Sequence, residues 1–217
     1  MGGALRATPG ALALRSRRVM LPDGLRPAVV EVRGGTVARV APWEEVPADL
    51  PLLDAGDLVV MPGLVDLHVH ANDPGRADWE GFPCATRAAA AGGVTTFLDM
   101  PLNSRPPTTT PEGLAAKTAA AAGRLWADVG LWAGVVPGNV EHLAGLWDSG
   151  VFGFKAFLAP SGVEEFAAVD EHDLRPALAE LARLGAPLLV HAELPHHLDE
   201  TWGAAADAAA RRRHGAH

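Results

Sequence analysis

The 217-residue chain has a single cysteine, no tyrosine and no long uncharged run. The lone Cys84 excludes a disulfide framework and a cysteine-based zinc finger, and it is typical of a reducing compartment. The longest stretch without Asp, Glu, Lys or Arg is 129–140, shorter than the about 18 residues of a membrane span. The N-terminus also lacks an apolar core followed by a cleavage site. We therefore expect a cytoplasmic protein without a membrane partner.

Basic residues are in the minority, since 18 Lys and Arg stand against 26 Asp and Glu for a formal net charge of −8. An acidic surface opposes binding to phosphate backbones, and no basic cluster is interleaved with aromatic residues. Nucleic acid is therefore not expected as a partner. The apolar content of 48% is ample for a packed core.

Residues 1–60 predict the N-terminal part of a small β-sandwich. Period-2 and β-branched signals run from about residue 12 to residue 60. The clearest pattern is a hairpin in which segments 29–33 and 36–40 flank Gly34 and Gly35. Two glycines at this point supply the positive φ angles that a tight turn requires.

Residues 61–217 change to short apolar runs that alternate with helical stretches. The predicted strands are 64–70, 94–100, 128–135, 151–158 and 187–191, and the predicted helices are 79–91, 111–123, 140–149 and 171–184. Strands buried on both faces and joined by helices imply a parallel sheet, in a barrel or a doubly wound sheet. No glycine-rich dinucleotide fingerprint follows the first strand. The α/β pattern fits an incomplete (β/α)8 TIM barrel with about five of its eight strands, so we expect the chain to end before the barrel closes.

His68 and His70 stand at the end of the first predicted barrel strand. Residues i and i+2 of a strand face the same way, so both imidazoles are expected to point into one space. In a barrel this carboxyl end of the strands is the active face. The pair suits a divalent metal, although two solvated histidines would give the same pattern.

Lys155 lies inside the predicted strand 151–158, and His191 ends the predicted strand 187–191. Lys155 lies in an otherwise apolar run, where an unpaired ammonium costs several kcal/mol unless it is neutralised or paired. A neutral amine can take up carbon dioxide to form a metal-binding carbamate, whereas a lysine at a strand end can also simply reach water. Together with His68 and His70, these residues would place four ligands on one rim.

Several motifs in order resemble those of the cyclic amidohydrolases, and among them the allantoinases most closely. The motifs are VMPGLVDLHVH at 60–70, NDPGR at 72–76, WEGF at 79–82, DMPLNS at 99–104, PPTT at 106–109, GVFGFK at 150–155 and VHAE at 190–193. The similarity runs from about residue 10 to residue 195. It implies a metal-dependent barrel that opens the hydantoin ring of allantoin with water to give allantoate, a step of purine catabolism.

The resemblance also implies roles for individual residues. His68 and His70 would bind one of two divalent ions, most often zinc. Carboxylated Lys155 would bridge both ions, and His191 would bind the second. Complete relatives of this kind would be homotetramers acting on a small molecule.

Asn72 and Asn103 are the predicted substrate-binding residues. Dihydroorotases, which are similar, carry an arginine at the position of Asn72 to hold a substrate carboxylate. Allantoin has no carboxylate, and an amide that donates and accepts suits its ureido and ring groups. Asn103 is a second candidate for the same task, or it braces its own loop.

The family pattern further implies a metal-binding histidine on a sixth strand and a general-base aspartate on an eighth. Neither has a counterpart here, so no general base is expected in the chain and the chain by itself is expected to be inactive. Two alternatives stay open. One is another cyclic amidase, of the hydantoinase or dihydroorotase type. The other is a non-catalytic scaffold member, which the retained His68, His70, Lys155 and His191 argue against.

Overall fold

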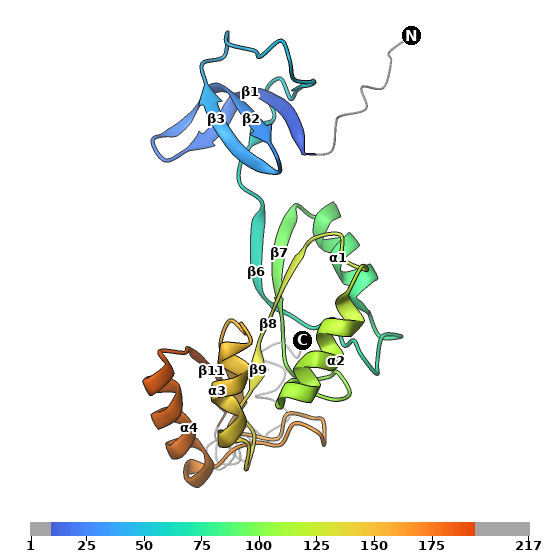
Figure 1. Ribbon diagram of the computed structural model, residues 1–217, viewed down its shortest axis with the longest axis vertical. Coiled ribbons are helices and arrows are strands. Elements are labelled where there is room, and N and C mark those ends of the chain that lie inside the picture. Colours follow the sequence, from blue (N-terminus) through green and yellow to red (C-terminus); the bar gives the residue numbers. More distant parts are fainter. Residues whose placement is uncertain (1–9, 194–217) are drawn as a thin grey trace, which may run out of the picture. The chain divides into compact units, whose positions relative to one another are not determined.

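The computed structural model describes residues 10–193, and the chain divides into two compact units between Gly63 and Leu64 (Figure 1). The boundary predicted from the sequence lies three residues earlier, after residue 60. Each unit has its own sheet system and its own core. Within residues 10–193 no helix is both long and apolar enough to cross a membrane.

The first unit is a mixed sheet of five strands with the order β3-β2-β1-β4, and β5 also pairs with β1. The strands are β1 (Ala11–Leu21), β2 (Gly24–Arg33), β3 (Thr36–Ala41), β4 (Leu52–Asp54) and β5 (Val59–Val60). The strands β1, β2 and β3 are antiparallel, whereas β4 and β5 run parallel to β1. In the described residues this unit is one sheet, so a sandwich built partly from it stays a prediction.

The predicted hairpin is confirmed in β2 and β3. Arg33 pairs with Thr36 across a two-residue turn, where Gly34 and Gly35 have φ angles of 59° and 78°. Two successive positive φ angles are strained for residues with a Cβ, which explains the two glycines. A small core forms under this sheet from Ala13, Val29 and Ala41.

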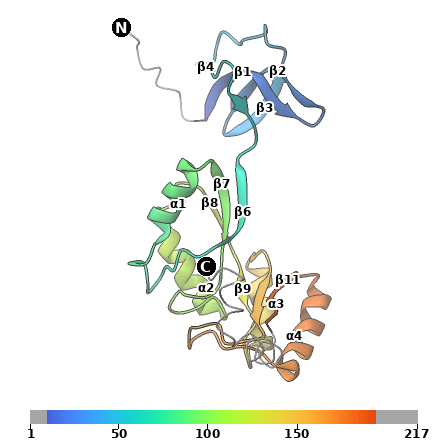
Figure 2. The same ribbon diagram turned by 180° about the vertical axis from the view of Figure 1, so that it is seen from behind.

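The second unit alternates strands and helices, as predicted. Its strands are β6 (Leu64–Val69), β7 (Val94–Asp99), β8 (Asp128–Leu131), β9 (Ala133–Gly134), β10 (Phe154–Phe157) and β11 (Leu188–His191), and its helices are α1 (Phe82–Ala91), α2 (Pro111–Ala121), α3 (Val140–Asp148) and α4 (Glu171–Leu184). All of the strand pairings are parallel. The helices α1 and α2 lie on the same side of the sheet formed by β6, β7 and β8 (Figure 2).

These six strands fill five consecutive positions of a partial barrel, because β8 and β9 are two parts of the third predicted strand. The sheets β6-β7-β8 and β9-β10-β11 meet at Trp132, which interrupts the third predicted strand. The amide of Trp132 still donates to the carbonyl of Asp99, and that of Phe152 to Leu131, so the ladder continues past the interruption. The chain order of the strands is therefore their spatial order, as in a barrel.

The main core of this unit lies between β9, β10 and the helices α3 and α4. Its fully buried members are Ala133, Val135, Leu143, Leu146, Phe154, Ala156 and Ala177. A second cluster packs α1 and α2 against β7 through Phe82, Ala85, Ala121 and Phe97. All four side chains of β10 are buried, as expected for a central strand.

Three sequence-based expectations are wrong in detail. The strands β6 and β11 are largely exposed rather than buried on both faces, and in the described residues each is an edge strand. The first helix begins at Phe82 rather than residue 79, since Gly81 has φ 76° and a proline follows at the helix start. The fourth predicted strand shortens to Phe154–Phe157, because Gly153 at φ 152° leaves strand geometry.

Candidate active site

The two adjacent histidines project from a bulge in β6. Asp66 pairs with Phe97 and Val69 with Asp99, so β6 contains one residue more than β7 over this stretch. The Asp66 carboxylate accepts a hydrogen bond of 3.0 Å from the amide of His68 inside the bulge. Bulges of this kind re-aim side chains at the ends of strands. The imidazole centroids of His68 and His70 lie 5.4 Å apart, so the structure brings this predicted pair together.

His70 is the more enclosed member of the pair. Burial lowers the pKa of His70 to about 4, and the positive charges of His68, Lys117 and Lys155 act in the same direction. The imidazole is therefore neutral near pH 7, which is the form that binds metal. Asn103 Nδ2 lies 3.3 Å from His70 Nδ1, so an amide from the loop after β7 holds the ring.

Lys155 lies in the middle of β10 and is only 5% exposed. Burial lowers the pKa of its ammonium group, as its apolar strand predicted. Its Nζ atom lies 5.1 Å from the centre of the Phe157 ring, on the same strand. The lysine is thus shielded from bulk water, and its charge acts on His70.

His191 lies at the carboxyl end of β11, in register with Phe157 of β10. Its ring stacks on Phe157 with centroids 4.8 Å apart and an interplanar angle of 13°. Its Nε2 atom is 2.9 Å from Glu193 Oε1. His191 therefore lies on the predicted rim, and Phe157 contacts both His191 and Lys155.

The four predicted metal ligands thus form two groups. His68 on β6 contacts His70 directly after that strand, and Phe157 links Lys155 to His191 on β10 and β11. Among residues 10–193 no hydrogen bond joins these groups, and no three His, Cys, Asp or Glu side chains cluster as a metal site. The metal role of the four residues stays a prediction.

Asn72 and Asn103 share an unusual backbone conformation, with φ angles of 61° and 69°. Asparagine tolerates this left-handed region better than most residues with a side chain. The Oδ1 atom of Asn72 is buried without a hydrogen-bond donor among the described residues. Each asparagine follows the end of a barrel strand, β6 or β7, near His70.

An ion pair that the sequence analysis did not assign ties the loops of this rim together. The Arg76 guanidinium binds the Glu165 carboxylate and donates a hydrogen bond of 2.8 Å to the carbonyl of Asn103. The amide of Arg76 also donates to the carbonyl of Asn72. Arg76 is the last residue of the NDPGR motif at 72–76, but only the fold shows that Glu165 is its partner.

A second unassigned pair, Asp99 and Lys117, is completely buried below the rim. Lys117 Nζ lies 2.5 Å from Asp99 Oδ2 and donates to the carbonyl of Met100 at 2.7 Å. Asp99 stood in the quoted DMPLNS motif. In the sequence, Lys117 resembles a solvated residue of an alanine-rich helix, so no local signal marks it.

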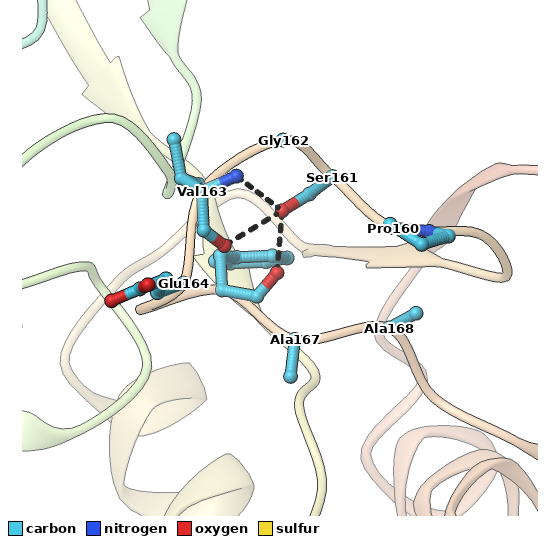
Figure 3. A pocket seen from close by; sticks show the side chains of 8 residues that line it. Pro160, Ser161, Gly162, Val163, Glu164, Ala167 and Ala168 are labelled. Carbon is cyan, nitrogen blue, oxygen red and sulfur yellow. Dashed lines mark hydrogen bonds between the residues drawn. The ribbon is translucent and has the colours of Figure 1, made fainter.

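The loop after β10 encloses an open cavity of about 400 Å³ lined by residues 160–164 and 166–168 (Figure 3). The Ser161 hydroxyl organises this loop. It accepts a hydrogen bond from the amide of Val163 and donates a hydrogen bond of 2.6 Å to the carbonyl of Phe166. The cavity wall is mostly apolar side chains and backbone, and it contains none of the predicted site residues. Its relevance to the site is that the same loop carries Glu165, the partner of Arg76.

Comparisons with known proteins agree with this architecture. The chain is 58% identical over 188 residues to the allantoinase of Streptomyces avermitilis, covering 86% of this chain and 42% of that protein. It is 45% identical over 195 residues to a protein of Aquarana catesbeiana named mitochondrial allantoinase, covering 88% and 40%. The solved L-hydantoinase of Arthrobacter aurescens is similar with a TM-score of 0.81 and 34% identity, over 93% of this chain and 46% of that one.

The chain thus spans about two fifths of the length of these curated relatives. The sequence profile described as the amidohydrolase family matches residues 59–217, which include the whole segment of alternating strands and helices. The fold, the strand order and this match agree, and the chain belongs to the amidohydrolase family.

Proposed function

We propose that this chain provides the first half of an allantoinase active site, which hydrolyses the ring amide of allantoin to give allantoate. The observation that carries the proposal is the bulged end of β6, where His68 and His70 lie side by side with a neutral His70. The identity to the Streptomyces avermitilis allantoinase supports this substrate over that of the hydantoinase, since identity to the former is 58% and to the latter 34%.

The donor chemistry of the side chains suits two divalent ions, for which we propose zinc. His68, His70 and His191 offer imidazole nitrogens, and buried Lys155 has the lowered pKa that carbamate formation requires. Divalent ions at such a site polarise a carbonyl and activate water. The chain's own contribution is to hold the neutral His70 between Asn103 and the end of β7, and to keep Lys155 out of bulk water.

Asn72 and Asn103 would bind the small-molecule substrate. The unpaired Oδ1 of Asn72 is a buried acceptor for an N–H group, and a ureido N–H is of this type. A dihydroorotate carboxylate would instead meet this oxygen lone pair and be repelled. The Asn72 amide therefore favours a neutral cyclic ureide.

A chimera tests the proposal directly. Residues 10–193 of this chain would replace the matching segment of the Streptomyces avermitilis allantoinase, and hydrolysis of allantoin would be followed with added zinc. We expect allantoin turnover, which is lost with chelator. Replacing His70→Ala or Lys155→Ala should lower kcat/KM by at least about 100-fold, since such groups act as a unit.

A matched control is His172→Ala, a histidine in the first turn of α4 that lies outside the site. This chimera should keep the parental activity. Turnover of a simple hydantoin but not of allantoin would instead indicate the hydantoinase alternative. A folded chimera that binds no zinc would contradict the proposed metal site.

A further inference from the structure

Asp99 of the buried Asp99–Lys117 pair and its neighbour Met100 together hold both peptide groups that flank His70. The peptide between Val69 and His70 is held by its carbonyl, which accepts a hydrogen bond of 2.7 Å from the amide of Met100. The peptide between His70 and Ala71 is held by its N–H group, which donates a hydrogen bond of 2.7 Å to Asp99 Oδ1. Two fixed peptide planes leave little freedom in φ and ψ, and they set the direction of the His70 Cβ atom.

Lys117 in turn holds the two residues that make these contacts. Its Nζ atom donates to Asp99 Oδ2 at 2.5 Å and to the carbonyl of Met100 at 2.7 Å. The exposed fraction of the side chain is 0% for Lys117 and 1% for Asp99. A buried ion pair is seldom the most stable solution for a core, because desolvation opposes the attraction between the charges. Its contact with the backbone beside His70 suggests a role in orienting that residue.

The position of Lys117 is itself restricted by the way its helix begins. The helix α2 that carries it begins at Pro111 and is capped by Thr110, whose side chain accepts a hydrogen bond from the amide of Gly113. A Cβ atom at Gly113 would lie 2.1 Å from the carbonyl oxygen of Pro107, so the helix start lies directly on the loop that follows β7. The position of Lys117 relative to Asp99 is thus determined by packing.

We propose that Asp99 and Lys117 are positioning residues, which fix the backbone of His70 so that its imidazole faces His68 with the spacing a shared ligand needs. The expected effect on zinc binding rests on the proposed function. The orientation of His70 can be measured without any metal. Asp99 acts through the amide of Ala71, and Lys117 acts by keeping the Asp99 carboxylate and the Met100 carbonyl in place.

Two double variants separate positioning from simple stability. Asp99→Asn with Lys117→Met removes both charges but keeps a side-chain oxygen that can accept from Ala71. Asp99→Leu with Lys117→Met also removes both charges, fills a similar volume and has no acceptor. Leu143→Ala, a fully buried position in α3, is the control for destabilisation away from the site.

Three readouts apply to each protein in the metal-free and zinc-titrated forms. They are hydrogen exchange of the Ala71 amide, the nuclear Overhauser contact between the rings of His68 and His70, and the zinc dissociation constant. In Leu143→Ala we expect all three to stay close to those of the parent chain. In the Asn–Met variant, which keeps an acceptor for the Ala71 amide but lacks the contacts of Lys117, we expect a partial loss of all three. In the Leu–Met variant we expect Ala71 protection to fall at least about 100-fold, the ring contact to weaken, and zinc affinity to drop about 10- to 100-fold.

The inference is overturned if the Leu–Met variant keeps the ring contact and Ala71 protection of the Asn–Met variant. It is also overturned if the Ala71 amide of the unaltered chain exchanges as fast as an exposed loop, a result that needs no variant to fold. If none of the proteins binds zinc, the proposed metal site fails, whereas amide exchange and the ring contact still decide the positioning role.

Discussion

Asn103 Nδ2 lies 3.3 Å from His70 Nδ1, so a residue predicted to bind substrate contacts a residue predicted to bind metal. The contact joins the loop after β7 to the end of β6. An amide can present either its nitrogen or its oxygen to the ring. In the structure the amide nitrogen faces Nδ1, which then accepts the hydrogen bond. Rotation of the amide, so that Oδ1 accepts from Nδ1–H, leaves the lone pair of His70 Nε2 free for a metal ion.

Replacing Asn103 should therefore affect the metal ligand. Asn103→Asp keeps an acceptor for Nδ1–H, whereas Asn103→Leu removes it. We expect the leucine variant to bind zinc about 10- to 100-fold more weakly than the parent, and the aspartate variant to stay within a few-fold. A competition titration against a chromophoric chelator measures both. Equal affinities in the two variants would restrict Asn103 to substrate binding or to bracing its loop.

Asn72 should determine substrate choice in the Streptomyces chimera. Losing a charge-assisted partner for a carboxylate costs about 3 kcal/mol, so allantoin should be preferred to dihydroorotate by at least about 100-fold in kcat/KM. Asn72→Arg should weaken allantoin turnover, because it places an unpaired cation beside the substrate. Steady-state kinetics with both substrates measure this. A chimera that prefers dihydroorotate would refute the assignment, and so would unchanged allantoin hydrolysis in Asn72→Arg.

The Arg76–Glu165 pair should contribute a pH-dependent part of the stability. Burial by itself would raise the pKa of the Glu165 carboxyl, but hydrogen bonding and attraction from Arg76 reverse the direction, and the pKa is lowered from 4.5. A carboxyl with a lowered pKa stabilises the fold above its ordinary pKa, and this contribution is lost as pH falls through the lowered value.

Glu165→Gln should thus cost about 1 kcal/mol at pH 7, and the difference from the parent should shrink below pH 4.5. Denaturant unfolding at several pH values measures the difference. The exposed pair of Glu171 and Arg175 in α4 is the matched control, since Glu171→Gln should change stability far less. A cost for Glu165→Gln that persists unchanged in acid would show that the charge is not responsible.

Two glycines in helices should respond in opposite directions to alanine. At Gly113 a Cβ atom would meet the Pro107 carbonyl oxygen at 2.1 Å, whereas at Gly145 in α3 nothing lies within 4 Å. We expect Gly113→Ala to destabilise the chain by about 1–3 kcal/mol and Gly145→Ala to stabilise it by about 0.5–1 kcal/mol. Thermal and urea unfolding check both. Stabilisation by Gly113→Ala would mean that α2 begins farther from the loop.

Local sequence patterns were sufficient for the order of elements and for the strand-end candidates. Alternation predicted the paired faces of His68 and His70, and apolar runs located the strands that carry Lys155 and His191. The predicted helix 171–184 agrees with α4 over its full length, and the structure shows a capping box of Asp170 and Asp173 at its start and a left-handed Gly185 at its end. Each of these signals acts between residues that are close in the chain, so composition and spacing encode it.

Only the tertiary structure decided which residues meet across the strands. Lys117 and Asp99 are 18 residues apart and Arg76 and Glu165 are 89 apart, and no local period relates either pair. Likewise, the stack of His191 on Phe157 depends on the register of β10 with β11. Burial then gives these contacts their effect, because a charge shielded from water needs a specific partner. The sequence by itself therefore predicted the strands that carry the candidate residues, and the fold determined which side chains contact them.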